Sequence, residues 1–169
     1  MMFFLANLSI IEITVDNFAV ASTFSVAKLS FEQGLINEAL KGFQEFLKSF
    51  PRSTYTAEAT DLLVNTLART SNFKEGLQLY AGIKNPSTLA QKAYPSLLYG
   101  RAVELINDQY INAADSLLDL LLAAPNNQDQ AVLAYFWKSE MQFRKGVYDQ
   151  GIVYLQKYLS EPIVNAEVN

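Results

Sequence analysis

Four stretches of the chain repeat the same order of small and large apolar residues. Each has a small residue, with a large apolar residue three positions before it and another four positions after it. Because residues at i, i+3, i+4 and i+7 share one face of an α-helix, each stretch predicts an amphipathic helix. The small residues, separated by 37, 37 and 38 positions, are Ala39, Gly76, Ala113 and Gly151. The large apolar residues are Ile36, Phe73, Tyr110 and Tyr148 before them, and Phe43, Tyr80, Leu117 and Leu155 after them.

A second amphipathic run of helical length precedes each stretch, and a proline follows three of the four stretches. Proline stops a helix because it lacks the amide donor and its ring clashes with the preceding turn. The small residue is expected where the backbone of another helix approaches closely. Only residues 9–15 have the composition of a strand. The pattern therefore predicts an all-α fold of helical hairpins, at residues 17–51, 54–84, 87–125 and 128–162, behind an apolar N-terminal segment, 1–16.

The third hairpin is expected to begin differently from the others. Asn85 and Pro86 signal a turn, and Ser87 is placed to cap a helix. Pro95 follows soon after, and proline is tolerated in a first helical turn but bends a helix interior. The sequence predicts either a short separate helix or one bent long helix here, as a spacer between repeats, with a binding loop as the alternative.

Four hairpins in one register resemble tetratricopeptide repeats, whose period is about 34 residues. The second helices match the family's order of apolar, small, aromatic and proline residues. In the first helices the small residue, twelve positions before the anchor, is Ala27 or Ser139, with Val64 in the second hairpin and Gly100 displaced by one in the third. The resemblance implies antiparallel hairpins stacked as a right-handed superhelix, an α-solenoid. The turn at residues 50–53 and the helix start at 56–59 are most similar to bacterial cell-envelope members, which implies the periplasm or envelope as the location.

The two ends of such a stack need polar caps. Residues 161–169 are too few for a capping helix, and the chain begins within an apolar run. No basic residue precedes Lys28, which argues against a signal peptide. Residues 1–16 are therefore expected to be a packed segment or a truncated preceding helix. The chain is expected to be a segment of a longer array, or to associate with itself through its uncapped ends.

Composition excludes several classes of function. The 169 residues include no histidine and no cysteine, so His-based triads, Cys nucleophiles, disulfides and zinc fingers are excluded. The net charge of −4, with scattered basic residues, argues against nucleic acid as a partner. No apolar run reaches the roughly 18 residues of a membrane span. We expect no enzyme activity, no cofactor and no metal.

Two motifs resemble chemical sites but are better explained by structure. Gly146 and Gly151 have the spacing of a phosphate loop, but Ile152 and Val153 follow where Lys and Ser or Thr are required. Both glycines are expected to serve the turn and the helix contact. Asp115 and Asp119 lie four apart on one predicted helix, which indicates an acidic solvated face, with a divalent-cation or basic-partner site as the alternative.

The first helices of tetratricopeptide hairpins line a concave groove, and the resemblance places nine residues of this chain there. They are Phe24, Lys28, Asp61, Asn65, Arg69, Arg101, Glu104, Glu140 and Arg144. Asn65 fits one position of the family's clamp for C-terminal carboxylates, but the matching lysines are missing, so no such binding is expected.

A groove of mixed charge with aromatic patches suits a peptide or protein surface. The sequence therefore predicts a non-catalytic scaffold for protein–protein interaction. The alternative is a ligand- or glycan-binding accessory module of the bacterial cell envelope. Exposed stacked aromatics beside amides would favour sugar, whereas charges alternating with apolar pockets would favour peptide.

Overall fold

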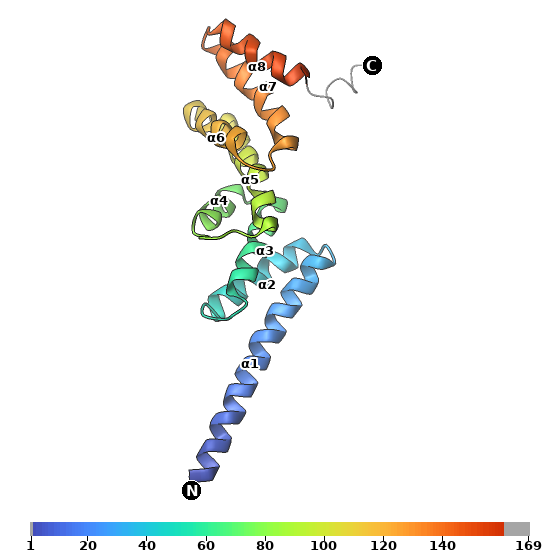
Figure 1. Cartoon of the computed structure of the whole chain (residues 1–169), viewed down its shortest axis with the longest axis vertical. Helices are drawn as coiled ribbons and strands as arrows, with labels where there is room; N and C mark the ends of the chain where they lie inside the picture. The colour runs from blue at the N-terminus through green and yellow to red at the C-terminus, as the bar shows by residue number, and fades with distance from the viewer. Residues whose placement is uncertain (1, 161–169) are drawn as a thin grey trace.

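The computed structural model describes residues 2–160, and the side chains of residues 17–160. These residues form eight α-helices and no strand, which confirms the all-α prediction. Consecutive helices pair as four hairpins that follow one another along the long axis of the molecule (Figure 1). The helices are α1 (Met2–Glu32), α2 (Ile36–Ser49), α3 (Thr56–Arg69), α4 (Phe73–Ala81), α5 (Thr88–Asn107), α6 (Ile111–Ala123), α7 (Gln128–Arg144) and α8 (Tyr148–Ser160).

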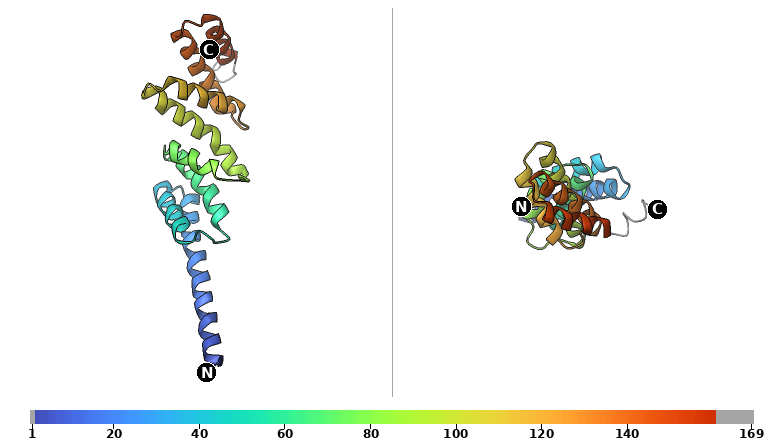
Figure 2. Two further views of the ribbon diagram at one scale, coloured as in Figure 1. Left: turned by 90° about the vertical axis from the view of Figure 1, so that its left-hand side faces the viewer. Right: turned by 90° about the horizontal axis from the view of Figure 1, so that it is seen from above.

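The first helix is longer than the sequence pattern indicates. α1 runs without a break from Met2 to Glu32, so the segment predicted at 1–16 continues, from residue 2, into the first helix of the hairpin predicted at 17–51. Residues 9–15, which have a strand-like composition, are helical as well. Its first half extends beyond the other helices (Figures 1 and 2). Among the described residues, no helix combines the length and the apolar character that crossing a membrane requires.

All four hairpin turns share one backbone geometry. The second residue after the first helix has a positive φ: 77° at Gly34, 58° at Ser71, 64° at Gln109 and 76° at Gly146. The amide of the next residue then donates to the carbonyl five positions back, as Leu35 does to Ser30 at 2.8 Å and Val147 does to Gln142 at 2.9 Å. This is the Schellman motif, which satisfies free carbonyls at a helix end. The repeated turn sets the start of every second helix two residues later.

The fourth residue of each second helix is small and buried, and in the third hairpin this residue is Ala114. Ala114 is fully buried, whereas Ala113, the residue predicted from the sequence, is exposed. Ile111 likewise takes the place predicted for Tyr110, which is 64% exposed. The separations are therefore 37, 38 and 37 positions, for Ala39, Gly76, Ala114 and Gly151.

The corrected register also aligns the first helices. Twelve positions before each small residue lies a buried residue of the first helix, and in the third hairpin this residue is Ala102 rather than Gly100. The four buried residues are Ala27, Val64, Ala102 and Ser139.

The small residues of the second helices make room for side chains of first helices rather than for their backbones. A Cβ at Gly151 would lie 2.8 Å from the ring of Phe143, and one at Gly76 would meet the methyl groups of Leu97. The close backbone approach that the sequence predicted occurs at Gly42 instead, where a Cβ would lie 3.2 Å from Cα of Ala27. Gly146 and Gly151 thus serve the turn and the helix contact, as expected.

α5 is one helix that contains Pro95, so the alternative of a short separate helix before Pro95 is excluded. Ser87 caps this helix as predicted, because its Oγ accepts a hydrogen bond from the amide of Ala90 at 3.3 Å. Pro95 is fully buried.

The hairpins stack so that first helices contact first helices. α3 contacts α1 and α5, and α7 contacts α5, whereas the backbones of neighbouring second helices lie farther apart and these helices meet through side chains, as in the hydrogen bond from Gln44 Nε2 of α2 to Glu75 Oε1 of α4 at 3.0 Å. Each second helix instead contacts the first helix of the next hairpin. The stack is elongated, with α1 and α8 at opposite ends (Figures 1 and 2). The first helices therefore form the continuous layer of the molecule.

The shared turn geometry leads to a prediction at Gly146. A Cβ there would meet no atom within 4 Å, so Gly146→Ala tests backbone conformation alone. We expect the free energy of unfolding to fall by about 1 kcal/mol, since a side chain disfavours the left-handed region. Urea denaturation measures the change. Gly82→Ala is the control, because Gly82 has φ −81°; an equal loss in both variants would contradict the strain argument.

Candidate functional site

Exposed faces of the first helices form the candidate site. We call three positions on each first helix the groove positions. They lie seven, eleven and fifteen residues before the buried small residue of the same hairpin. Seven of the nine residues predicted from the sequence lie at a groove position: Phe24, Lys28, Asp61, Asn65, Arg69, Glu140 and Arg144. In the third hairpin the corrected register assigns Tyr99, Val103 and Asn107 to these positions instead of Arg101 and Glu104.

Phe24 belongs to the core rather than to an open groove. Its side chain is 4% exposed, and its ring stacks on Tyr55 with centroids 4.8 Å apart. Lys28 lies one turn later, with its Nζ 5.9 Å from the Phe24 ring and 2.8 Å from Oε1 of Glu58. The hydrogen bond and the charge of Glu58 raise the pKa of Lys28. This exposed ion pair links α1 to α3 and covers the ring of Phe24. A partner at this point would therefore contact Lys28 and Glu58 rather than Phe24.

In the second hairpin the groove positions have three different environments. Asp61 Oδ2 accepts a hydrogen bond from the amide of Ser87 at 3.3 Å, which ties α3 to the start of α5. Burial, followed by the charges of Tyr94 and Asp61, raises the pKa of the nearby Tyr80. Asn65 is half-buried, and the exposed Arg69 places its guanidinium 5.6 Å from the centroid of the Phe31 ring. Arg69 is thus the exposed charge of this part of the groove.

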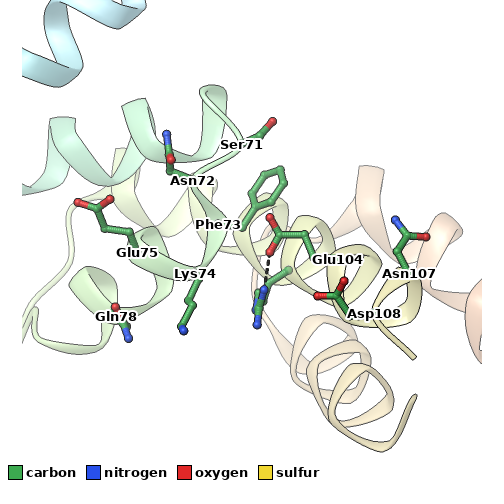
Figure 3. Close-up of a pocket in the computed structure, with 10 residues that line it drawn as sticks. Ser71, Asn72, Phe73, Lys74, Glu75, Gln78, Glu104, Asn107 and Asp108 are labelled. Atoms are coloured by element: carbon green, nitrogen blue, oxygen red, sulfur yellow. Dashed lines mark hydrogen bonds and ion pairs between the residues drawn. The ribbon is translucent and has the colours of Figure 1, made fainter. Parts of the chain in front are cut away.

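Arg101 and Glu104 lie together beside α4, and Glu104 also lines the hollow between α5 and α7 that is described below. They form an ion pair of 2.7 Å at the edge of a crevice of about 820 Å³, into which α4 also projects Lys74 and Glu75 (Figure 3). At the equivalent positions of α3, Leu63 and Thr66 are buried, and Leu63 packs in the core that α3 shares with the second helix of the preceding hairpin. Arg101 and Glu104 thus lie at the junction of α4 and α5, and their predicted role in partner binding stays a prediction.

An apolar hollow that the sequence analysis missed lies between α5 and α7. It has a volume of about 420 Å³ and is lined by Tyr99 and Val103 of α5 and Leu133 of α7, among others. Leu133 is 42% exposed. The hollow is held on both sides by hydrogen bonds, from Trp137 Nε1 to the Tyr99 hydroxyl at 3.3 Å and from Gln130 Nε2 to Ser96 Oγ at 3.1 Å. Beyond it on α7, Arg144 donates to Glu140 at 2.8 Å.

The acidic pair on α6 is neutralised within the chain. Lys138 of α7 is 3% exposed and places its Nζ 2.7 Å from Asp115 and 2.6 Å from Asp119, while Lys145 lies 3.3 Å from Asp115. The predicted acidic solvated face is therefore wrong for Asp115, whose carboxylate joins α6 to α7. No group of three or more acidic side chains that could hold a metal ion occurs in the described part of the chain.

This network shifts two pKa values. Burial opposes the charge of Asp115, but hydrogen bonds and charges of Lys138 and Lys145 outweigh it and hold the pKa of Asp115 below its ordinary value. Burial likewise opposes the charge of Lys138, but Asp115 and Asp119 outweigh it and raise its pKa. Both groups therefore stay charged at neutral pH.

Comparisons of the chain with protein-family models, with curated proteins and with solved structures gave no match.

The buried position of Lys138 leads to a stability prediction. Lys138→Ala removes the cation and leaves Asp115 partly buried beside α7, so we expect a loss of about 3 kcal/mol or more of unfolding free energy. Lys145→Ala is the matched control: its side chain is 38% exposed, and its loss should stay below about 1 kcal/mol. Urea denaturation of both variants checks the difference, and equal losses would contradict the assignment.

The lowered pKa of Asp115 predicts a dependence on pH. An acid whose pKa is lower in the folded state stabilises the fold above its unfolded pKa, about 3.8, and this contribution disappears as pH falls through the folded value. Wild type should therefore exceed Asp115→Asn in unfolding free energy at pH 7, by a margin that shrinks at pH values below about 4. Urea denaturation at several pH values measures the margin; a constant margin would contradict the prediction.

Proposed function

We propose that the chain is a non-catalytic scaffold of the tetratricopeptide type, a right-handed superhelix that binds an extended peptide or a protein surface along its first helices. The observation that carries the proposal is the apolar hollow between α5 and α7, which opens at groove positions and has the carboxylate of Glu104 in its lining. Such a combination suits a peptide, because an apolar anchor enters the hollow and polar groups around it set the orientation.

The arrangement of helices supports the superhelix. The backbones of neighbouring first helices lie closer together than those of neighbouring second helices, which supports a superhelix with the first helices inside its curve. In an array of this kind the inner surface is preformed, and a ligand meets residues from several hairpins at once. Preformed sites bind without the entropic cost of ordering loops.

A peptide fits the hollow better than a sugar does. Two tyrosine pairs stack on each other, Tyr80 on Tyr94 at 4.3 Å and Tyr135 on Tyr154 at 6.4 Å, so those ring faces are shared within the chain. In the hollow itself, Val103 and Leu133 supply aliphatic surface, and Tyr99 lies in the same lining as the amides of Asn107 and Gln130. The aliphatic surface favours a peptide, whereas the aromatic and amide groups are the feature that the glycan-binding alternative would use.

Peptide selection tests the proposal. A random-peptide display library is selected on the wild-type chain, and an enriched peptide is synthesised with a fluorophore for polarisation measurements. We expect Leu133→Asp to weaken its binding at least about tenfold, because the charge enters the apolar hollow. Leu120→Asp is the matched control: Leu120 is 52% exposed on α6, outside the hollow.

The charged part of the groove has its own test with the same peptide. Arg69→Ala and Arg144→Ala together should weaken binding while the circular dichroism spectrum and melting temperature stay unchanged. Failure to enrich any peptide, or a loss in Leu120→Asp equal to that in Leu133→Asp, would overturn the proposed function.

A further inference from the structure

α8 exposes an apolar face at positions that other second helices use for stacking. Ile152 and Leu159, one and eight positions after Gly151, are 46% and 49% exposed. At the same positions of α2, Leu40 and Leu47 are partly buried against the core that α2 shares with α3. In α6 the second of these positions is Leu122, which packs against the core shared with α7. The free face of α8 therefore has the residues of a hairpin–hairpin interface.

α1 exposes the complementary half of that interface. Val26 and Leu29, thirteen and ten positions before Ala39, are 66% and 52% exposed. In α7 the same positions are Lys138 and Met141, both 3% exposed. Lys138 binds two carboxylates of α6, and Met141 packs in the core that α6 and α7 share. These positions on a first helix thus bind the second helix of the preceding hairpin.

We propose that α8 of one molecule binds α1 of a second copy, in the way that α2 binds α3 and α6 binds α7 within the chain. The argument for a second copy is continuity: one kind of interface recurs at the α2–α3 and α6–α7 junctions, and the two ends of the described stack display its two halves. The exposed residues named on both halves are uncharged, so docking would bury no unpaired charge at these points.

The two faces belong to different surfaces, so the contact is heterologous and runs head to tail. A head-to-tail contact between elongated stacks extends the array instead of closing a two-fold dimer. The association leaves the groove positions of both copies free, and it is independent of the proposed peptide binding.

Sedimentation equilibrium of the full chain over a wide range of concentrations tests the proposal. The weight-average mass of wild type should rise with concentration beyond that of a dimer. Val26→Glu and Ile152→Glu should each stay monomeric, because each places a carboxylate in one half of the interface. Both residues are exposed, so neither change disturbs the core.

Val153→Glu is the matched control. Val153 is 45% exposed beside Ile152, and the same position holds the polar residues Lys41 in α2 and Gln78 in α4. This variant should associate like wild type.

Mixing the two monomeric variants gives the sharpest result. Val26→Glu keeps an intact α8, and Ile152→Glu keeps an intact α1, so the mixture should form a dimer that grows no further. A wild-type chain that stays monomeric at all concentrations would overturn the proposal, and the α8 face would then be left for a different partner. Dimers of Val26→Glu alone would also overturn it, because they would show that α8 binds α8.

Discussion

Every other feature of this structure depends on the left-handed turn that closes each hairpin. One residue with positive φ and one hydrogen bond across six residues place the start of each second helix at a constant distance from the end of the first. A helix has 3.6 residues per turn, so one extra residue in this turn would rotate the second helix by about 100°. Four turns of one geometry therefore set which face of each helix is buried and which is free.

The sequence was sufficient for the eight helices and their pairing, because the apolar period is strong in the second helices. It was not sufficient for the register of the third hairpin. Ala113 and Ala114 are both small, and the apolar residues around them also come in adjacent pairs, so two registers fit the pattern almost equally well. Only the turn at Gln109 distinguishes them, and a glutamine does not signal positive φ as glycine does. With Ala113 as the small residue the groove positions would be the buried Leu98, Ala102 and Ile106, whereas Ala114 gives Tyr99, Val103 and Asn107.

The buried ion pair shows a second limit of reading a sequence by local spacing. Asp115 and Asp119 are neighbours on one helix, and their lysine follows about twenty positions later in the chain. No local pattern marks Lys138 as buried, since lysine is almost always exposed. Its position becomes intelligible once the register is known, because it takes the place that Leu63 takes in α3, facing the preceding hairpin.

One register thus gives each first helix three sets of positions with different roles. One set packs inside the hairpin, a second binds the preceding hairpin, and the third faces the groove. Different residues at the positions of one set then give each hairpin its own surface without changing the fold. Leu63 in α3 and Lys138 in α7 belong to the second set. Both are buried against the preceding hairpin, Lys138 because two carboxylates of α6 pair with it. Where this set carries Arg101 and Glu104, paired with each other, a polar crevice opens beside α4. Because the sets are separate, residues at the groove positions can differ between hairpins while the residues that stack the hairpins on each other are kept.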